Sequence, residues 1–192
     1  MSAGAPGRSD SHVKVTYDDF LLFPDDGNRH ELIEGEHYLS PSPNIKHQAI
    51  LINLVGLLWS RLQEHPVGRA FCAPLDIVLS NADVVEPDLL YMSHERAASI
   101  LTPQNVRGMP ELVVEIASAG TRARDETMKY RLYEKSGVAE YWMIDPEHDA
   151  VTAYRNIEGR FARAATLTLD RHDVLTTSLL PGLQLPLARL FA

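Results

Sequence analysis

Apolar residues along the chain follow two different periods. From Ile45 to about His65 they are nearly continuous over the length of a long helix, which predicts a largely buried central helix rather than a surface amphipathic one. Beyond this segment they form short runs of strand length, most of them uninterrupted, as in a sheet that is covered on both faces. The predicted strands comprise residues 69–72, 75–79, 88–92, 112–116 and 141–145.

Helix and turn signals place further elements around these strands. Thr16 is expected to cap a short helix over residues 17–23, and Glu34-Gly35 predicts a hairpin between its flanking apolar segments. Later elements are helices at 94–101 and 124–136, the second ending at Gly137, then meandering strands at 151–154 and 161–164 and a Pro181-Gly182 turn. The pattern indicates the α/β (α+β) class, with a mixed central sheet flanked by helices and an added β-meander.

Length and composition indicate a globular protein. With 192 residues, of which 45% are hydrophobic and 23% charged, the chain can bury one substantial core. We expect a single domain over residues 16–192, preceded by a small, polar, disordered tail at residues 1–15. No segment is long and apolar enough to span a membrane, and the single Cys72 fits a reducing compartment. A cytoplasmic location is therefore expected.

Charge is distributed unevenly. The formal net charge of -8 argues against a protein that coats nucleic acid non-specifically, because such binding depends on clustered basic residues. The densest basic segment nevertheless lies between Arg122 and Lys135, directly after the strand predicted at 112–116. A local basic surface thus remains compatible with nucleic-acid binding.

Carboxylates interrupt several of the apolar segments. Glu115 lies within the run Leu-Val-Val-Glu-Ile, where an unpaired carboxylate would cost at least several kcal/mol. Other acids in or beside predicted strands are Glu31, Asp76 and Asp88. If the sheet brings these groups together, they form the oxygen-rich type of site that Mg²⁺ or Mn²⁺ prefers. A metal ion held there would polarise a phosphodiester.

A lysine on the following helix is the candidate partner of this acidic group. Ala117, two residues after Glu115, leaves no lysine on the strand itself, whereas Lys129 lies on the next predicted helix. Asp125, Lys129 and Tyr133 are spaced four residues apart and so share one helix face. A strand, loop and helix of this length can fold that face over the end of the strand.

Taken in order, these segments resemble a family known as "putative restriction endonuclease", a group of unknown function that is common in bacteria and belongs to the PD-(D/E)XK nuclease superfamily. The similarity covers about residues 17–165. It is carried by these ordered segments: Glu31-Leu-Ile-Glu-Gly-Glu36, His47, Ala73-Pro-Leu-Asp-Ile-Val-Leu79, Glu86-Pro-Asp-Leu-Leu90, Leu112-Val-Val-Glu-Ile116, Thr121 to Tyr133, Gly137-Val138 and Tyr141-Trp-Met-Ile-Asp-Pro146.

The resemblance implies a restriction-endonuclease-like core and a metal-dependent nuclease acting on nucleic acid, with DNA the expected substrate. Asp88 and Glu115 would hold Mg²⁺ or Mn²⁺, and Glu31 would be a further acidic group. Lys129, on the helix, would take the role of the lysine that the superfamily places at the strand position occupied here by Ala117. Arg122 and Arg124 are expected to bind phosphates. Because double-strand cleavage by one small active site is most simply achieved by a two-fold dimer, a homodimer is expected.

Alternative interpretations remain for individual residues. Glu115 is also compatible with an ion-paired core glutamate, and Lys129 with an ordinary surface pair to Asp125. Glu34 competes with Glu31, and Glu86 with Asp88. His47 would support the site or be structural, and Asp76 would orient a basic residue or cap a strand. A second hypothesis for the whole chain is a catalytically weak or inactive nuclease fold that serves as a nucleic-acid-binding or oligomerisation module.

Overall fold

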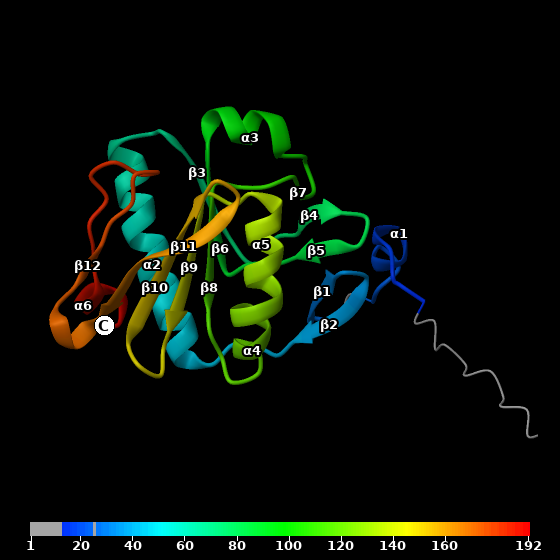
Figure 1. Cartoon of the computed structure of the whole chain (residues 1–192), viewed down its shortest axis with the longest axis horizontal. Coiled ribbons are helices and arrows are strands. Elements are labelled where there is room, and N and C mark those ends of the chain that lie inside the picture. Colours follow the sequence, from blue (N-terminus) through cyan, green and yellow to red (C-terminus); the bar gives the residue numbers. More distant parts are fainter. Residues whose placement is uncertain (1–12, 25) are drawn as a thin grey trace, which may run out of the picture.

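A six-stranded mixed sheet forms the centre of the computed structural model, which describes residues 13–24 and 26–192 (Figure 1). The strand order is β11-β10-β9-β8-β6-β3, in which β8 and β9 run parallel and the other neighbouring pairs run antiparallel. The strands are β3 (Gly68–Cys72), β6 (Leu89–Ser93), β8 (Leu112–Ile116), β9 (Glu140–Asp145), β10 (Ala150–Ile157) and β11 (Arg160–Thr168). The mixed sheet expected from the sequence is confirmed.

Different elements cover the two faces of this sheet. The long α2 (Ile45–Glu64) and the C-terminal α6 (Leu187–Leu190) pack on one face, together with the ribbon formed by β12 (Val174–Leu175) and β13 (Leu185–Pro186). The other face is covered by α3 (His94–Ile100), by α5 (Tyr130–Ser136) and by a second sheet. Buried apolar residues on both sides explain why the central strands are uninterrupted apolar runs.

The alternation of side chains along β8 decides where Glu115 points. Leu112, Val114 and Ile116 belong to the core beneath α2, whereas Val113 and Ala117 belong to the core on the opposite side. Because successive side chains of a strand face opposite sides, Glu115 faces the side of α5. The strand thus holds a carboxylate rigidly beneath that helix.

A second, five-stranded sheet was not expected from the sequence. Its order is β2-β1-β5-β4-β7, with only β4 and β7 parallel. The strands are β1 (Arg29–Ile33), β2 (Glu36–Ser40), β4 (Ile77–Ser80), β5 (Asp83–Val85) and β7 (Val106–Arg107). β5, which joins the N-terminal hairpin to β4, has three residues, too few for a recognisable period in the sequence.

Burial of α2 differs from the prediction. The side chains that pack on the sheet lie along one face, but Ile45, Ile52 and Trp59 are 89%, 66% and 63% exposed. The prediction of a largely buried helix is therefore wrong for one face. Apolarity showed which residues can be buried, but the rest of the described chain offers nothing to cover this side.

The remaining predicted elements are largely confirmed. α1 (Tyr17–Phe20) is shorter than expected but begins at Thr16, which forms a capping box with Asp19. Glu34 and Gly35 have φ values of 55° and 78°, as a two-residue hairpin turn of type I′ requires.

The helix predicted at 124–136 consists of α4 (Arg122–Arg124), a π-helical turn η1 (Asp125–Lys129) and α5, which ends at Gly137. A 3₁₀ turn, η2 (Leu169–Arg171), follows β11.

The N-terminal tail predicted at residues 1–15 lies mostly outside the described residues, which begin at Val13. Val15 donates its backbone N–H to the carbonyl oxygen of Gly35 at 2.8 Å. The described chain is thus attached to the first hairpin from Val15 onward.

Candidate active site

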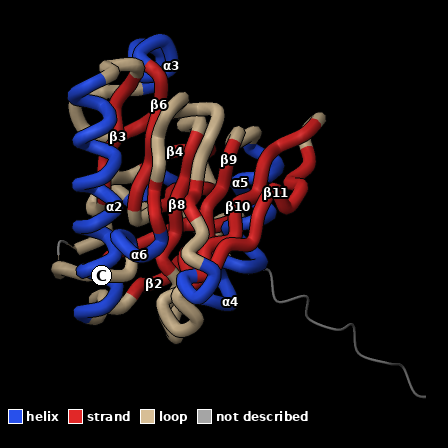
Figure 2. Tube along the Cα trace, turned by 90° about the vertical axis from the view of Figure 1, so that its left-hand side faces the viewer, coloured by secondary structure: helices blue, strands red, loops and turns tan. Residues whose placement is uncertain are grey.

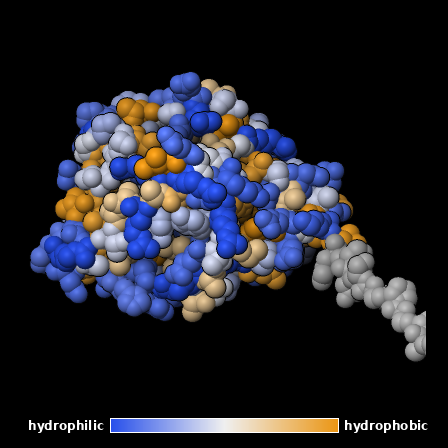
Figure 3. Space-filling view, in the orientation of Figure 1, coloured by the Kyte–Doolittle hydropathy of each residue, from blue (hydrophilic) through white to orange (hydrophobic). Residues whose placement is uncertain are grey.

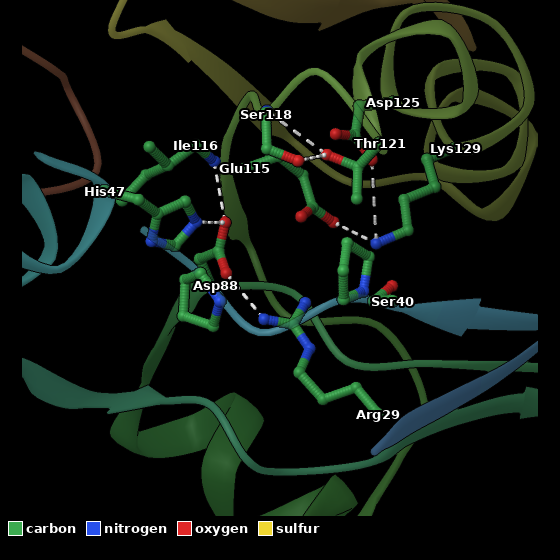
Figure 4. A pocket seen from close by; sticks show the side chains of 12 residues that line it. Arg29, Ser40, His47, Asp88, Glu115, Ile116, Ser118, Thr121, Asp125 and Lys129 are labelled. Atoms are coloured by element: carbon green, nitrogen blue, oxygen red, sulfur yellow. Dashed lines mark hydrogen bonds and ion pairs between the residues drawn. The ribbon is translucent and has the colours of Figure 1, made fainter. Parts of the chain in front are cut away.

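A small polar cavity lies where the two sheets and the π-helical turn meet (Figure 4). Its volume is about 20 Å³, room for one water molecule or one metal ion. The lining includes Arg29, His47, Asp88, Glu115, Asp125 and Lys129. Residues separated by as many as 100 positions in the sequence, from β1 to η1, therefore contribute to one site.

Asp88 lies at the start of β6 and is held by three donors. Arg29 Nη1 lies 2.8 Å from Oδ1, while Oδ2 accepts a 2.8 Å hydrogen bond from the backbone N–H of Ile116 and lies 3.1 Å from His47 Nε2. The antiparallel pairing of Leu89 with Val114 brings Asp88 next to the end of β8. Sheet register, rather than sequence proximity, thus brings the predicted pair of carboxylates to one cavity.

Glu115 is buried and accepts two hydrogen bonds on the same oxygen. Lys129 Nζ lies 2.9 Å and the Tyr133 hydroxyl 2.7 Å from Oε1. Both donors come from the helical segment that covers this face of β8. Figure 4 shows the carboxyl groups of Glu115 and Asp88 facing the same small space, with Lys129 and Arg29 on its borders.

The π-helical turn presents Lys129 to the site. Its characteristic wide hydrogen bond runs from the N–H of Tyr130 to the carbonyl oxygen of Asp125. The same carbonyl accepts a 3.2 Å hydrogen bond from the Tyr141 hydroxyl, which anchors the turn to β9. π-helical turns recur at functional sites because they re-aim side chains within a helix. The Lys129 side chain is 1% exposed, so the interpretation as a surface pair with Asp125 is wrong.

Glu31 is a third carboxylate in contact with Lys129. Its Oε1 lies 2.7 Å from Lys129 Nζ and accepts a 3.0 Å hydrogen bond from the N–H of Glu86. Its Oε2 lies 3.5 Å from Arg124, which also donates to Ser40 Oγ at 2.6 Å. Glu34, the alternative to Glu31, is exposed on the hairpin turn and contacts Lys135 instead.

Burial and neighbouring charges shift the pKa values of the acids in opposite directions. Burial, reinforced by Asp125, Asp88 and Glu31, raises the pKa of Glu115 to about 8, although Lys129 opposes the shift. Burial also opposes ionisation of Asp88, but the His47 hydrogen bond and the charge of Arg29 lower its pKa to about 2. Burial alone would lower the pKa of Lys129, yet the surrounding carboxylates raise it well above its usual value.

Two predicted site residues have other partners: Asp76, expected as a supporting residue, and Arg122, expected to bind phosphate. Asp76 lies outside the cavity lining and hydrogen-bonds Glu86, whose pKa burial and Asp76 together raise to about 7. Arg122 donates to both oxygens of Asp145, at 2.8 and 2.7 Å. Asp76 therefore pairs with an acid rather than orienting a basic residue, which was one of the two roles expected for it, and the Arg122 charge is already compensated.

The cavity has features that fit a divalent cation. Asp125 Oδ1 is buried without a hydrogen-bond partner, 3.8 Å from Lys129 Nζ. Mg²⁺ is commonly bound through one or two carboxylates and completes its coordination with water and substrate phosphate, so Asp88 and Glu115 are a sufficient protein donor set. The raised pKa of Glu115 also reflects an excess of acidic groups that a cation would offset.

One other acidic cluster lies on the surface. Among the described residues, Asp145, Glu147 and His148 form the one group of three acidic or histidine side chains whose ligand atoms lie within 4.8 Å of one another, and no three such side chains of the buried cavity approach so closely. Arg122 already pairs with Asp145 and lies 3.3 Å from Glu147, which leaves this cluster compensated. The candidate active site is therefore the buried cavity.

Sequence reasoning missed two groups at the cavity. Arg29 alternates with Glu31 on one face of β1, a period-two signal that would have linked them. Tyr133 shares the helix face of Lys129 and donates its hydroxyl hydrogen bond to Glu115, a role that the sequence analysis did not predict. Seven residues that the sequence analysis had named lie at or beside the cavity: Asp88, Glu115, Lys129, Glu31, Asp125, His47 and Arg124.

Comparisons with known proteins identify the family and the fold of the chain. A family model described as "Uma2: Putative restriction endonuclease" matches residues 17–188. A crystal structure of a putative nuclease belonging to DUF820 from Anabaena variabilis ATCC 29413 is 24% identical, with a TM-score of 0.75 over 92% of this chain and 97% of that one. No protein of curated function matches the chain. None of the helices in the described residues is long and apolar enough to cross a membrane.

Proposed function

This chain belongs to the Uma2 family of putative restriction endonucleases, and from that premise we propose that it is a metal-dependent endonuclease that hydrolyses phosphodiester bonds in DNA. The observation that carries the proposal is the position of Lys129. Its ammonium group lies 2.9 Å from Glu115 in the cavity that Asp88 also lines, although Ala117 occupies the strand position expected for a lysine.

Asp88 and Glu115 are the proposed ligands of Mg²⁺ or Mn²⁺, with Asp125 Oδ1 as a further oxygen at the same cavity. When bound, such an ion polarises the phosphodiester and lowers the pKa of water. The chain itself prepares the ligands. His47 and the Ile116 N–H fix Asp88 in its ionised form, and Tyr133 fixes Glu115.

Lys129 is the proposed group that orients the attacking water or stabilises negative charge developing on phosphorus. Its charged form is secured by Glu31 and Glu115, at 2.7 and 2.9 Å. Glu31 thereby acts as a positioning residue, since it holds the lysine in place. Burial of all three side chains limits their conformational freedom, which suits a preorganised site.

A phosphate contact is proposed for Arg124, whose guanidinium group lies beside the cavity. Arg122, the other arginine expected in this role, would first have to leave Asp145. A homodimer, which would provide two active sites for the two strands of DNA, and a cytoplasmic location complete the proposal.

The test is cleavage of supercoiled plasmid by the purified full chain. We expect nicking in Mg²⁺ or Mn²⁺ that is lost in EDTA and in Asp88→Asn or Glu115→Gln. If the wild-type protein binds neither metal at millimolar concentration and leaves DNA and RNA intact, the catalytic proposal is wrong.

A second candidate function is a non-cleaving module that binds nucleic acid or oligomerises. It is favoured by the saturation of the acids: Arg29 and His47 already satisfy Asp88, and Lys129 satisfies Glu115. Because the net charge of -8 makes non-specific DNA binding weak, it favours the oligomerising form of such a module over the form that binds nucleic acid. Binding of DNA without metal-dependent cleavage would support this function over the nuclease.

A further inference from the structure

An uncharged stripe runs along the exposed side of α2, between the exposed charged residues Lys46 and Glu64 near the two helix ends. Six residues of the helix, spaced three or four apart, point away from the sheet: Ile45, Gln48, Ile52, Gly56, Trp59 and Gln63. All six are exposed and none carries a charge, in a chain of which 23% is charged. Figure 2 shows α2 at the rim of the molecule, with β3 beside it. The molecular face in Figure 3, by contrast, is mostly hydrophilic, with small separate apolar patches. We call the six residues the α2 stripe.

Gly56 lies near the middle of this stripe. A glycine within a helix is destabilising relative to alanine, because it loses more backbone freedom on folding. A Cβ atom added at Gly56 would meet no atom of this chain within 4 Å, so packing within the described structure does not require the glycine. Close approach of another backbone is a physical reason for glycine at an exposed helix position.

An apolar groove adjoins the stripe. It has a volume of about 280 Å³ and lies between α2, β3 and the start of β6. Its lining consists of Val55, Trp59, Ala70, Phe71, Cys72 and Leu89. β3 is the end strand of the six-stranded sheet and pairs only with β6 in the described structure. The stripe and the groove share Trp59, so exposed apolar residues of the helix adjoin an apolar groove, a combination found at protein interfaces.

We propose that the α2 stripe is the two-fold interface through which two copies of this chain associate. The inference rests on the homodimer of the proposed function and adds the surface that forms it. Copies with a net charge of -8 repel one another, and that repulsion is smallest where the contact carries no charge. A two-fold contact also juxtaposes identical patches, so a stripe centred near its glycine matches a second copy of itself.

The interface would fix the spacing of the two active sites. His47, which contacts Asp88, lies on α2 nine residues before Gly56. With antiparallel copies of α2 crossing at Gly56, the two histidines would lie about 27 Å apart along the helix axis, from the helical rise of about 1.5 Å per residue. The helix would thus connect the dimer contact to both cavities.

The first test compares two exposed isoleucines by sedimentation velocity of the full chain. Ile52 is 66% exposed in the stripe and Ile157 is 58% exposed on β10, away from it. We expect wild type and Ile157→Lys to sediment as dimers, and Ile52→Lys as a monomer with at least a tenfold weaker dimer dissociation constant. Lysine reduces the net charge, so added general repulsion could not explain dissociation. A monomeric wild type, or a dimeric Ile52→Lys, would overturn the proposal.

A second variant tests the contact at Gly56 even if Ile52→Lys fails to fold. Gly56→Gln improves helix propensity, so the isolated fold gains stability. The glutamine side chain also occupies the open space beside the helix and blocks close approach of a second α2 backbone. We expect a rise in Tm of about 2–4 °C for the dilute monomer, with loss of the dimer. A dimer that persists in Gly56→Gln would show that α2 is not the interface.

Cleavage measurements separate this inference from the proposed function. Monomeric Ile52→Lys is expected to nick plasmid DNA while losing double-strand cuts. If wild type forms the α2 dimer but cuts nothing, the nuclease proposal fails and the interface stands. If wild type nicks DNA as a monomer, the nuclease stands and the interface fails.

Discussion

Replacing Lys129 with methionine tests the charge balance of the cavity. Methionine keeps much of the side-chain length but removes the cation that lies 2.7 Å from Glu31 and 2.9 Å from Glu115. Removing one partner from a buried ion pair costs about 3–5 kcal/mol, because the remaining charge is left uncompensated. We therefore expect the metal-free variant to lose about 3–5 kcal/mol of unfolding free energy at pH 8, measured by urea denaturation.

The loss should depend on pH with a definite sign. Without the ammonium group, the raised pKa of Glu115 rises further and Glu31 loses a positive charge that lowers its pKa, so the folded protein retains protons to higher pH. The carboxyl groups are then neutral near pH 5 and the loss is small, and it grows as the pH rises through the folded-state pKa values. In wild type the Lys129 pKa is raised, so its stabilising contribution is complete at pH 8 and is lost only at higher pH.

Lys135→Met is the matched control. Lys135 lies on the same helical segment, but it is 55% exposed and 3.8 Å from Glu34, so its removal should change stability by less than about 0.5 kcal/mol. Saturating Mg²⁺ should restore part of the stability of Lys129→Met, since the ion supplies positive charge to the same carboxylates. A loss below about 1 kcal/mol that is equal at pH 5 and pH 8 would refute the assignment of Lys129 as their counter-ion.

Two further predictions concern the ion and the phosphates. Because Glu115 has a pKa raised to about 8 and must lose its proton to bind a cation, the apparent Kd for Mn²⁺ should weaken by up to tenfold per pH unit below pH 8. Isothermal titration between pH 6 and pH 8 measures this, and a constant Kd would contradict it. Arg124→Gln should lower plasmid nicking more than Arg122→Gln, since Arg124 lies beside Glu31 whereas Arg122 pairs with Asp145. Equal losses in a nicking time course would show that Arg122 leaves Asp145 during the reaction.

More of the candidate site residues than of the surrounding strands could be predicted from the sequence. A glutamate inside an apolar strand is costly enough to be noticed, and the spacing of Lys129 on the next helix suggested its partner. The position of Arg29 could not be predicted in the same way, because its contact with Asp88 spans 59 residues and two different sheets. The bidentate pair of Arg122 with Asp145 likewise depends on how α4 and β9 are placed.

Two features of the fold were inaccessible to periodicity. The five-stranded sheet depends on the short β5, whose residues Asp83–Val85 show no period of their own. The helix α2 was predicted to be largely buried because its apolarity is nearly continuous, but apolarity does not show which face the rest of the chain covers.

The most direct test of the nuclease proposal is plasmid cleavage by wild type and Glu115→Gln across a titration of Mg²⁺ and Mn²⁺. Glutamine keeps the size of the side chain and an oxygen for Lys129 and Tyr133, but lacks the charge that a cation requires. The proposal predicts metal-dependent nicking by wild type and a loss of at least about a hundredfold in the variant, because ligand loss weakens both ion binding and electrostatic stabilisation. Equal cleavage by the two folded proteins, or none by wild type at any metal concentration, would contradict it.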